Sequence, residues 1–480
     1  MNLVWLRNDL RLEDNPALYH ATHQGDTCCV YSITPEQWRQ HDDAPAKIAL
    51  WRERLIAVQH ELREHNIPLK LIRFTNDNES TYSNIPEALL ELANRIDAHS
   101  IYFNNEYPLN EKQRDRHVSE LFIYEGKQIN RYDGDVVMQP GTVKTQQDAT
   151  YKVFTPFSRQ WHKLAGENQL VMVGKPATQN ASLLSLDEDV KTQWLVEDTP
   201  YRQDLWPAET DAIHQRLHQF AAHRASNYKE MRDIPSVNGT STLSPYLACG
   251  AISVRQCISA IRQNVEEWRS NQWITELIWR EFYRHLIDSY PHLSRSENFI
   301  SLVKPIPWNN DEENFLAWCE GRTGYPIVDA AMKQLVQTGW MHNRLRMVTA
   351  AFLTKLLLVD WRKGEAFFMQ HLLDGDYASN NGGWQWAAST GADAAPYFRI
   401  FSPERQSERF DKEGVFIKKL LPELSTLTKK TIHTPNSEQR KSCGYIEPVV
   451  DYKWARQRAL EEYATAMGKV KNKNDSPVKN

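Results

Sequence analysis

The sequence lacks the features that mark an exported, membrane-spanning or metal-binding protein. Its six cysteines show no paired metal-binding spacing, and the adjacent Cys28 and Cys29 lie in an apolar run that suits a buried strand. No stretch reaches the roughly 18 apolar residues of a membrane span, and the N-terminus is charged by Arg7, unlike a signal peptide. We therefore expect a soluble, cytoplasmic protein without a metal ion.

The sequence also lacks an excess of positive charge. A formal net charge of -4 and a pI near 6.5 give no general attraction to nucleic acid, so any such surface must be a local patch. No GxGxxG motif follows the first apolar run, which excludes a nicotinamide-type dinucleotide site. There is no internal repeat, and 480 residues are enough for two domains with separate cores.

Alternating patterns in the first part of the chain predict a doubly wound parallel α/β sheet. Four short apolar runs, NLVWL, CCVYSIT, PLKLIRF and SIYFNNEY, are separated by amphipathic stretches typical of helices, such as residues 51–65. Ligands of such sheets bind beyond the carboxyl ends of the strands. We expect that edge at residues 7–9 and 104–111.

The second part of the chain predicts an all-helical fold. From about residue 205, Trp, Leu, Ile and Phe recur at intervals of three and four, punctuated by Pro and Gly. The sequence thus indicates an α/β domain over residues 1–138, a polar interdomain linker over 139–204, an all-helical domain over 205–467 and a lysine-rich polar tail over 468–480.

Two segments of the helical part have the composition of a binding site. Residues 374–403 combine two spaced acids, paired Asn and Gly, and two of the chain's sixteen tryptophans. Taken alone, residues 380–383 are expected to form a simple turn. The hydroxyl-rich loop 239–245 precedes a helix that Ser244 can cap, and by itself the loop fits either helix capping or phosphate binding.

Residues 374–403, together with RNDLRLEDNPAL, YKVFTPF, WREFYRHL, TGYPIVDAAM and WMHNRLRM, give the chain its resemblance to a known family. The sequence resembles the DNA photolyase and cryptochrome family over nearly its whole length, and most closely the bacterial class I cyclobutane pyrimidine dimer photolyases with a folate antenna. The resemblance implies a monomer that holds folded-back, non-covalent FAD. Its reduced anionic form would donate an electron, under light, to a flipped-out dimer in UV-damaged DNA.

The resemblance also implies which residues hold the flavin. Asn380 would face flavin N5, where a neutral amide can follow a changing protonation state. Arg346, paired with Asp374 beside the ring, would favour the anionic reduced form. For Glu276 and Arg280, a plain i,i+4 ion pair on a helix surface is the alternative. The implied FAD contacts are Tyr228, Thr240, Ser241, Thr242, Leu243, Ser244, Trp273, Arg280, Arg346, Asp374, Asp376 and Asn380.

A second implied set recognises the lesion and its DNA. Trp279 and Trp386 would pack on the two joined pyrimidine rings and Met347 would add a soft contact. Glu276 and Asn343 would hydrogen-bond the base edges, and Glu276 would also stabilise the radical anion. The residues that match phosphate-contacting positions are Arg232, Arg344 and Arg399.

The last implied sets serve electron transfer and light harvesting. Trp308, Trp361 and Trp384 match a chain of indoles that photoreduces the flavin, and core packing is the alternative. Asn110 and Glu111 match contacts of a 5,10-methenyltetrahydrofolate antenna, and helix capping is the alternative. Two neighbouring antenna positions depart from the family pattern, Ser294 and Arg295.

Two other functions share this fold and flavin. A cryptochrome-like blue-light photoreceptor is the first alternative, and Asn380 together with the complete lesion set argues against it. Repair of the 6-4 photoproduct is the second, and it typically needs a catalytic histidine in the helix that here carries Asn343. The adjacent His342 would point about 100° away around that helix.

Overall fold

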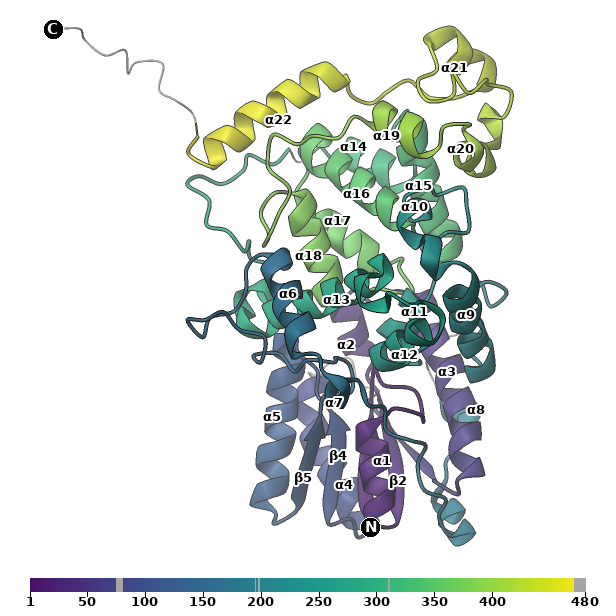
Figure 1. The fold of residues 1–480 in the computed structure, drawn as a ribbon, viewed down its shortest axis with the longest axis vertical. Helices are drawn as coiled ribbons and strands as arrows, with labels where there is room; N and C mark the ends of the chain where they lie inside the picture. The colour runs from purple at the N-terminus through teal and green to yellow at the C-terminus, as the bar shows by residue number, and fades with distance from the viewer. Residues whose placement is uncertain (75–80, 195, 197–198, 310, 470–480) are drawn as a thin grey trace, which may run out of the picture.

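The computed structural model describes residues 1–74, 81–194, 196, 199–309 and 311–469. In Figure 1 the sheet lies in the lower half, in purple and blue, and the helices from α9 onward form the upper half, in teal to yellow. Most of the expected polar tail, residues 470–480, lies outside the described residues. No helix among the described residues is long and apolar enough to cross a membrane.

The lower half is a parallel sheet with strand order β3-β2-β1-β4-β5, as the sequence pattern predicts. The four apolar runs form the first four strands. The fifth was not predicted because it is polar and only partly buried at the sheet edge. In chain order the elements are β1 (Asn2–Leu6), α1 (Pro16–Gln24), β2 (Thr27–Ile33), α2 (Pro35–Gln40), α3 (Pro45–Glu64), β3 (Leu69–Arg73), α4 (Thr81–Arg95), β4 (Ser100–Asn104), α5 (Leu109–Tyr124) and β5 (Gln128–Tyr132).

Both faces of the sheet are covered by helices. In β1, Val4 and Leu6 face the side packed by α1 and α3, whereas Leu3 and Trp5 face the side packed by α4 and α5. A strand with two buried faces must be apolar at every position, which explains the unbroken apolar runs of the sequence. The polar carboxyl ends of the strands are left at the edge nearest the helical half (Figure 1).

The segment expected as a polar linker carries short helices of its own. Phe157 and Trp161 of the first of these are fully buried, and this helix packs against α13 of the upper half. Two apolar residues four apart are a weak helix signal in a polar context, so the sequence pattern missed it. The elements are α6 (Phe154–Leu164), α7 (Glu167–Leu170), η1 (Ala181–Leu186) and α8 (Val190–Gln193).

The upper half is helical, as predicted. Its first elements are α9 (Thr210–His223), η2 (Ala225–Asn227), α10 (Tyr228–Met231), α11 (Ser244–Ala248), α12 (Val254–Asn264), η3 (Trp268–Ser270), α13 (Gln272–Ser289) and η4 (Pro291–Arg295). Then follow α14 (Glu312–Cys319), α15 (Pro326–Thr338), α16 (Asn343–Ala351), η5 (Phe352–Leu357), α17 (Trp361–Met369) and α18 (Tyr377–Ala387). The last are α19 (Pro403–Phe410), α20 (Val415–Leu420), η6 (Pro422–Leu424), α21 (Ser437–Cys443) and α22 (Tyr452–Ala466).

Helix α18 corrects one prediction. Residues 380–383 do not form a turn but lie inside this helix, which packs against α13, α16 and α17. The two glycines of this segment, Gly382 and Gly383, differ in the space around them. A Cβ on Gly382 would lie 2.2 Å from the ring of Tyr283 on α13, whereas a Cβ on Gly383 would meet nothing within 4 Å. Gly382 therefore permits a close helix contact, which a local turn pattern does not reveal.

We expect Gly382→Ala to destabilise the protein and Gly383→Ala to leave it unchanged or slightly more stable. The added methyl at position 382 must displace the Tyr283 ring, at a cost of about 1–3 kcal/mol. At position 383 alanine gains up to about 1 kcal/mol of helix propensity. Thermal unfolding of the two variants checks this. Equal melting temperatures would contradict the close α13–α18 contact.

Candidate functional site

Helix α18 begins at an acidic side chain that also belongs to an ion-pair network. Asp376 is its N-cap and accepts a hydrogen bond from the backbone N–H of Ser379 at 2.8 Å. One turn later Asn380 donates from Nδ2 to the carbonyl of Glu365 at 3.0 Å. This bond fixes the amide and leaves its Oδ1 without a donor among the described residues. Asn380 therefore presents a free, neutral acceptor.

The expected pair of Arg346 and Asp374 is present. Arg346 Nη2 lies 2.8 and 3.0 Å from the two carboxylate oxygens of Asp374, and its Nε donates to the carbonyl of Met341 at 2.8 Å. The Asp374 side chain is buried, whereas Arg346 is partly exposed. The guanidinium is thus anchored on one side and still has donors to offer on the other.

The loop before α11 exposes backbone donors. Among the described residues, no group accepts a hydrogen bond from the backbone N–H of Thr240, Ser241 or Thr242. The chain can take this shape because Thr242 adopts a φ of 53° and the N–H of Leu243 turns back to Ser241 Oγ at 3.4 Å. Unpaired N–H groups beside several hydroxyls suit an anionic oxygen.

The helix-capping alternative for this loop is wrong. The N-cap of α11 is Leu243, and no side chain caps it. Ser244 instead accepts a hydrogen bond from Trp340 Nε1 at 3.3 Å. Two more of the expected contacts, Tyr228 and Trp273, are buried and both lie against the ring of Phe220.

Helix α13 does not form the plain ion pair that was the alternative for Glu276 and Arg280. Glu276 instead pairs with Arg232 of the segment after α10 and accepts from Gln272 Nε2 at 2.9 Å. Arg280 pairs with Asp135, which follows β5. Both side chains therefore point to segments far away in the sequence, as site residues often do.

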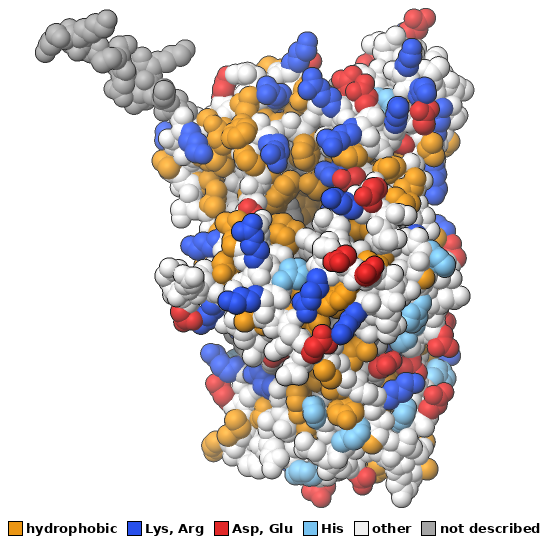
Figure 2. All heavy atoms as spheres, viewed as in Figure 1, with side chains coloured by type: hydrophobic (Ala, Val, Ile, Leu, Met, Phe, Trp, Pro, Cys, Tyr) orange, Lys and Arg blue, Asp and Glu red, His pale blue; other side chains and the backbone are white. Residues whose placement is uncertain are grey.

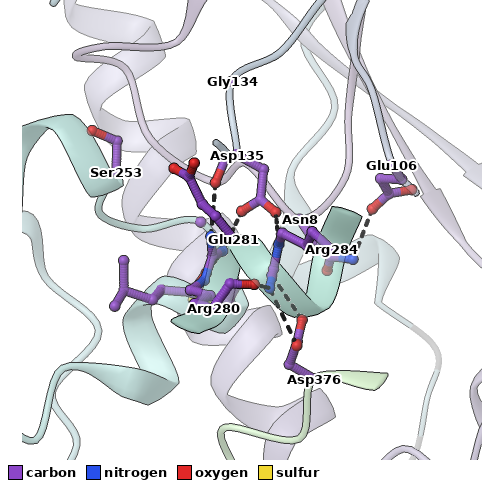
Figure 3. Close-up of polar contacts among 12 residues, drawn as sticks. Asn8, Glu106, Gly134, Asp135, Ser253, Arg280, Glu281, Arg284 and Asp376 are labelled. Carbon is purple, nitrogen blue, oxygen red and sulfur yellow. Dashed lines mark hydrogen bonds and ion pairs between the residues drawn. The ribbon is translucent and has the colours of Figure 1, made fainter. Parts of the chain in front are cut away.

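A chain of charges links α13 to α18 and to the sheet half (Figure 3). Asp135 holds both Arg280 and Arg284, which lie one helical turn apart. Arg284 Nη2 also contacts Asp376 Oδ2 at 2.8 Å. Burial opposes ionisation of Asp376, but the charges of Arg284 and Arg280 outweigh it and hold the pKa of Asp376 well below its ordinary value. Sequence reasoning missed Arg284, whose only signal was its i+4 spacing from Arg280.

Three of the expected lesion and phosphate residues lie along a second string of charges, namely Glu276, Arg232 and Arg344. From Glu276 on α13 it runs through Arg232 and Asp233 to Arg344 on α16, with Arg344 Nη2 at 2.9 Å from Asp233. Arg344 also lies 3.8 Å from Met347 Sδ. The string brings α13 and α16 to one surface.

Two neighbours on α16 have different positions. Asn343 is exposed at the start of the helix, whereas His342 is its buried N-cap and accepts from the N–H of Arg344 at 3.2 Å. Burial lowers the pKa of His342 to about 4. His342 is therefore a neutral structural residue and is not placed to act on a ligand at the surface.

The three expected electron-transfer tryptophans run from the core outward. Trp384 and Trp361 are buried, whereas Trp308 is partly exposed. Trp384 lies against the first turn of α17, which begins with Trp361, since a Cβ on Gly364 would lie 2.1 Å from its ring. Trp308 packs edge-on against Tyr463 at 6.2 Å. The order fits the expected path and equally allows core packing.

A cavity of about 410 Å³ lies where the two halves meet, at the carboxyl edge of the sheet. Asn110 and Glu111 line it. The first N–H of α5, that of Leu109, donates to Ser294 Oγ at 3.2 Å, and neither Asn110 nor Glu111 caps the helix, so the capping alternative is wrong. Asn110 Nδ2 lies 3.2 Å from His41 Nε2, and Glu111 accepts from Tyr82 at 3.1 Å. Of the two departing positions, Ser294 lines the cavity and Arg295 does not.

Two family models match the chain, DNA photolyase over residues 2–177 and the FAD binding domain of DNA photolyase over residues 273–465. A deoxyribodipyrimidine photo-lyase of Vibrio cholerae is 43% identical to it, over 98% of this chain and 100% of the relative. The chain belongs to the DNA photolyase family.

Solved structures of the photolyase family share its architecture. A class III photolyase from Agrobacterium tumefaciens superposes with a TM-score of 0.86 at 32% identity, covering 97% of both chains. A cryptochrome from Synechocystis gives a TM-score of 0.81 at 27% identity, covering 96% of this chain and 98% of that one. Photolyases and cryptochromes thus share this fold, and the side chains of the site must distinguish repair from signalling.

One buried acid beside Asn380 has a raised pKa. Glu365 is buried and accepts from Asn381 Nδ2 at 2.9 Å, and burial raises its pKa to about 7. The folded protein therefore keeps this proton over a pH range, from an ordinary pKa of about 4.3 up to 7, in which the unfolded chain has lost it. Its contribution to stability is complete at low pH and is lost as the pH rises through this range.

We expect Glu365→Gln to remove this part of the pH dependence. Between about pH 5 and pH 8 the wild type should lose about 2–3 kcal/mol more of its free energy of unfolding than the variant does. Urea unfolding at both pH values measures the difference, and Glu266→Gln, at an exposed position, is the matched control. Parallel losses in wild type and Glu365→Gln would show that the carboxyl is already ionised in the folded state.

Proposed function

We propose that the protein binds FAD and uses light to split cyclobutane pyrimidine dimers in UV-damaged DNA. The observation that carries the proposal is the string of contacts from Glu276 through Arg232 and Asp233 to Arg344, with Met347 beside it. On one surface it brings together residues that are expected to hydrogen-bond the base edges, to contact the dimer and to bind phosphates. The photo-lyase name of the Vibrio cholerae relative supports the same activity.

The donor set of the helical half fits FAD. The free N–H groups of the loop before α11 and its hydroxyls suit a diphosphate. Arg346, anchored by Asp374, offers a positive charge where a negative ring would sit, and Asn380 offers its free Oδ1 to N5. Bound FAD, once reduced and excited by light, supplies the electron that opens the dimer and takes it back.

The chain's own residues position the lesion and control its charge. Glu276, fixed by Arg232 and Gln272, can hydrogen-bond a base edge while Arg232 offsets its charge. Asn343 is exposed at the start of α16 and can reach the second base. A dimer is already poorly stacked, so extruding it costs less than extruding a normal base. Trp279 and Trp386, both partly exposed, can replace the lost stacking.

The surface of the helical half agrees with this use. Figure 2 shows a shaded recess in the upper half of this face, with orange side chains on its wall and several blue ones around it. Phe398 is 61% exposed beside the exposed Arg399. Local positive charge beside apolar side chains can bind a DNA backbone and a base together, despite the net charge of -4.

We place a folate antenna, 5,10-methenyltetrahydrofolate, in the cavity between the two halves. Asn110 and Glu111 face it and could hydrogen-bond a pterin. The protein acts as a monomer in this proposal. Cysteines that are free in the structure fit the reducing cytoplasm.

The alternative function, a cryptochrome-like photoreceptor, has less support. It shares the fold, but the match to the Synechocystis cryptochrome is 27% identical, against 43% for the Vibrio cholerae photo-lyase. A receptor would not need a complete set of lesion contacts along α13 and α16.

Repair of irradiated oligothymidylate tests the proposed function. The reduced, FAD-loaded protein is mixed with the oligomer, and thymine absorbance is followed under blue light and in the dark. We expect recovery only in the light, because the dimer opens only after electron transfer from excited flavin. No recovery, with FAD bound and reduced, would contradict repair, and light-dependent capture of a partner protein would then favour the photoreceptor.

We expect Trp361→Phe to block photoreduction of oxidised FAD while chemically reduced protein still repairs dimers. Phenylalanine fills most of the indole space but is much harder to oxidise. It also removes the hydrogen bond from Trp361 Nε1 to Asn298 Oδ1 at 3.1 Å. Flavin absorbance under light, compared with repair after dithionite reduction, separates the two effects. Loss of both activities would mean that the indole serves core packing instead.

A further inference from the structure

One face of the proposed lesion tryptophan Trp279 is covered by another aromatic ring. Phe154 lies parallel to it, with ring centroids 3.7 Å apart and planes 8° apart. This is full stacking contact. Trp279 also meets Phe282 edge-on and Tyr283 at a tilt of 35°, both with centroids 5.7 Å apart, and it remains partly exposed. A pyrimidine ring therefore cannot approach the face that Phe154 covers.

The Phe154 ring is itself held in place by its surroundings, so it can fix the Trp279 ring. It is 7% exposed and meets Phe282 of α13 edge-on at 5.8 Å. Phe154 is also the first residue of α6, and its backbone N–H donates to Asp393 Oδ2 at 3.1 Å. Asp393 thus caps α6 from a distant part of the chain, since no side chain of the helix's own N-cap does so.

Asp393 connects this stack to the second proposed lesion tryptophan. It lies in the segment that follows α18, and this segment folds back on Trp386. The carbonyl of Trp386 accepts from the N–H groups of Ser389 at 3.3 Å and Ala395 at 3.2 Å. A short path of contacts therefore runs from Trp279 through Phe154 and Asp393 to the backbone around Trp386.

We infer that Phe154 is a positioning residue for lesion binding. Its ring fixes the plane of Trp279, and its bond to Asp393 sets where Trp279 stands relative to Trp386. The inference rests on the proposed function, because it assumes that a dimer packs between the two tryptophans. Phe154 does not touch the dimer. It holds the Trp279 side chain in the binding orientation before the lesion arrives, so that less side-chain entropy is lost on binding.

The neighbouring Phe157 shows what an ordinary core residue of the same helix does. It is fully buried, and its ring contacts are Tyr151, Phe282 and His285, with centroids 6.3, 5.2 and 5.0 Å away. Trp279 is not among its ring contacts. Phe157→Leu is therefore a matched control for the loss of aromatic packing between α6 and α13.

The test compares affinities in the dark for one oligonucleotide with and without a single thymine dimer. Variants are Phe154→Leu, Phe154→Tyr and Phe157→Leu, all loaded with FAD. We expect Phe154→Leu to raise the Kd of the damaged oligonucleotide about two- to tenfold, the range of one aromatic pair, and to leave the Kd of the undamaged one unchanged. Phe154→Tyr keeps an aromatic ring and should bind the damaged oligonucleotide almost as tightly as wild type. Phe157→Leu should lower the melting temperature and leave both Kd values unchanged.

A double-mutant cycle with Trp279→Ala shows whether Phe154 acts through the indole. In that background Phe154→Leu should have no further effect on the damaged oligonucleotide. An equal effect with and without Trp279 would overturn the inference, as would a Phe154→Leu protein that binds the lesion like wild type. A wild-type protein that does not prefer the damaged oligonucleotide would instead overturn the proposed function itself.

Discussion

A buried carboxylate on α13 holds the chain that leaves the sheet, and the helix that follows it, against the helical half. Glu281 is fully buried, and it accepts from the N–H groups of Val137 at 2.5 Å and Met138 at 3.2 Å and from Trp161 Nε1 at 2.7 Å. Burial raises its pKa. A buried acid without these donors would be costly, and the donors without the acid would be unpaired. The chain leaving the sheet must therefore meet α13 at this point.

Once α13 is fixed, the other sites follow from its geometry. Glu276 lies about one and a half turns and Trp279 about half a turn before Glu281, on the proposed lesion surface. Arg284 lies about one turn after Glu281 and faces the cavity between the halves. Asp135 and Asp376 neutralise Arg280 and Arg284, so the network adds little net charge beside a flavin. Asp376 then fixes the start of α18, and with it Asn380.

Much of the fold could be predicted from the sequence, because buried strands and amphipathic helices leave clear periodic patterns. The exceptions have physical reasons. Strand β5 is a polar edge strand, and the glycine pair of α18 does not make a turn, because Gly382 permits a close contact with Tyr283. The members of the site were predicted by resemblance to a family, since no local pattern distinguishes Asn380 or Asn343 from ordinary polar residues.

The partners of the site residues could not be predicted from the sequence. Glu276 finds Arg232, Arg280 finds Asp135, and Trp279 finds Phe154, each across more than 40 residues. Such pairs depend on how helices pack, and no periodicity records them. For the same reason the sequence pattern predicts only a polar linker over residues 139–204. The first helix of that segment donates a hydrogen bond from Trp161 to Glu281 and stacks Phe154 on Trp279.

A crystal structure of the reduced protein with duplex DNA that contains one thymine dimer is the most direct measurement of the central claim, that α13 and α16 form the lesion site. We predict that the dimer is flipped out of the DNA duplex and lies between Trp279 and Trp386, with Glu276 and Asn343 at its base edges. Phe154 should still be stacked on the other face of Trp279. A dimer that stays stacked in the duplex, or that binds away from α13, would contradict the account.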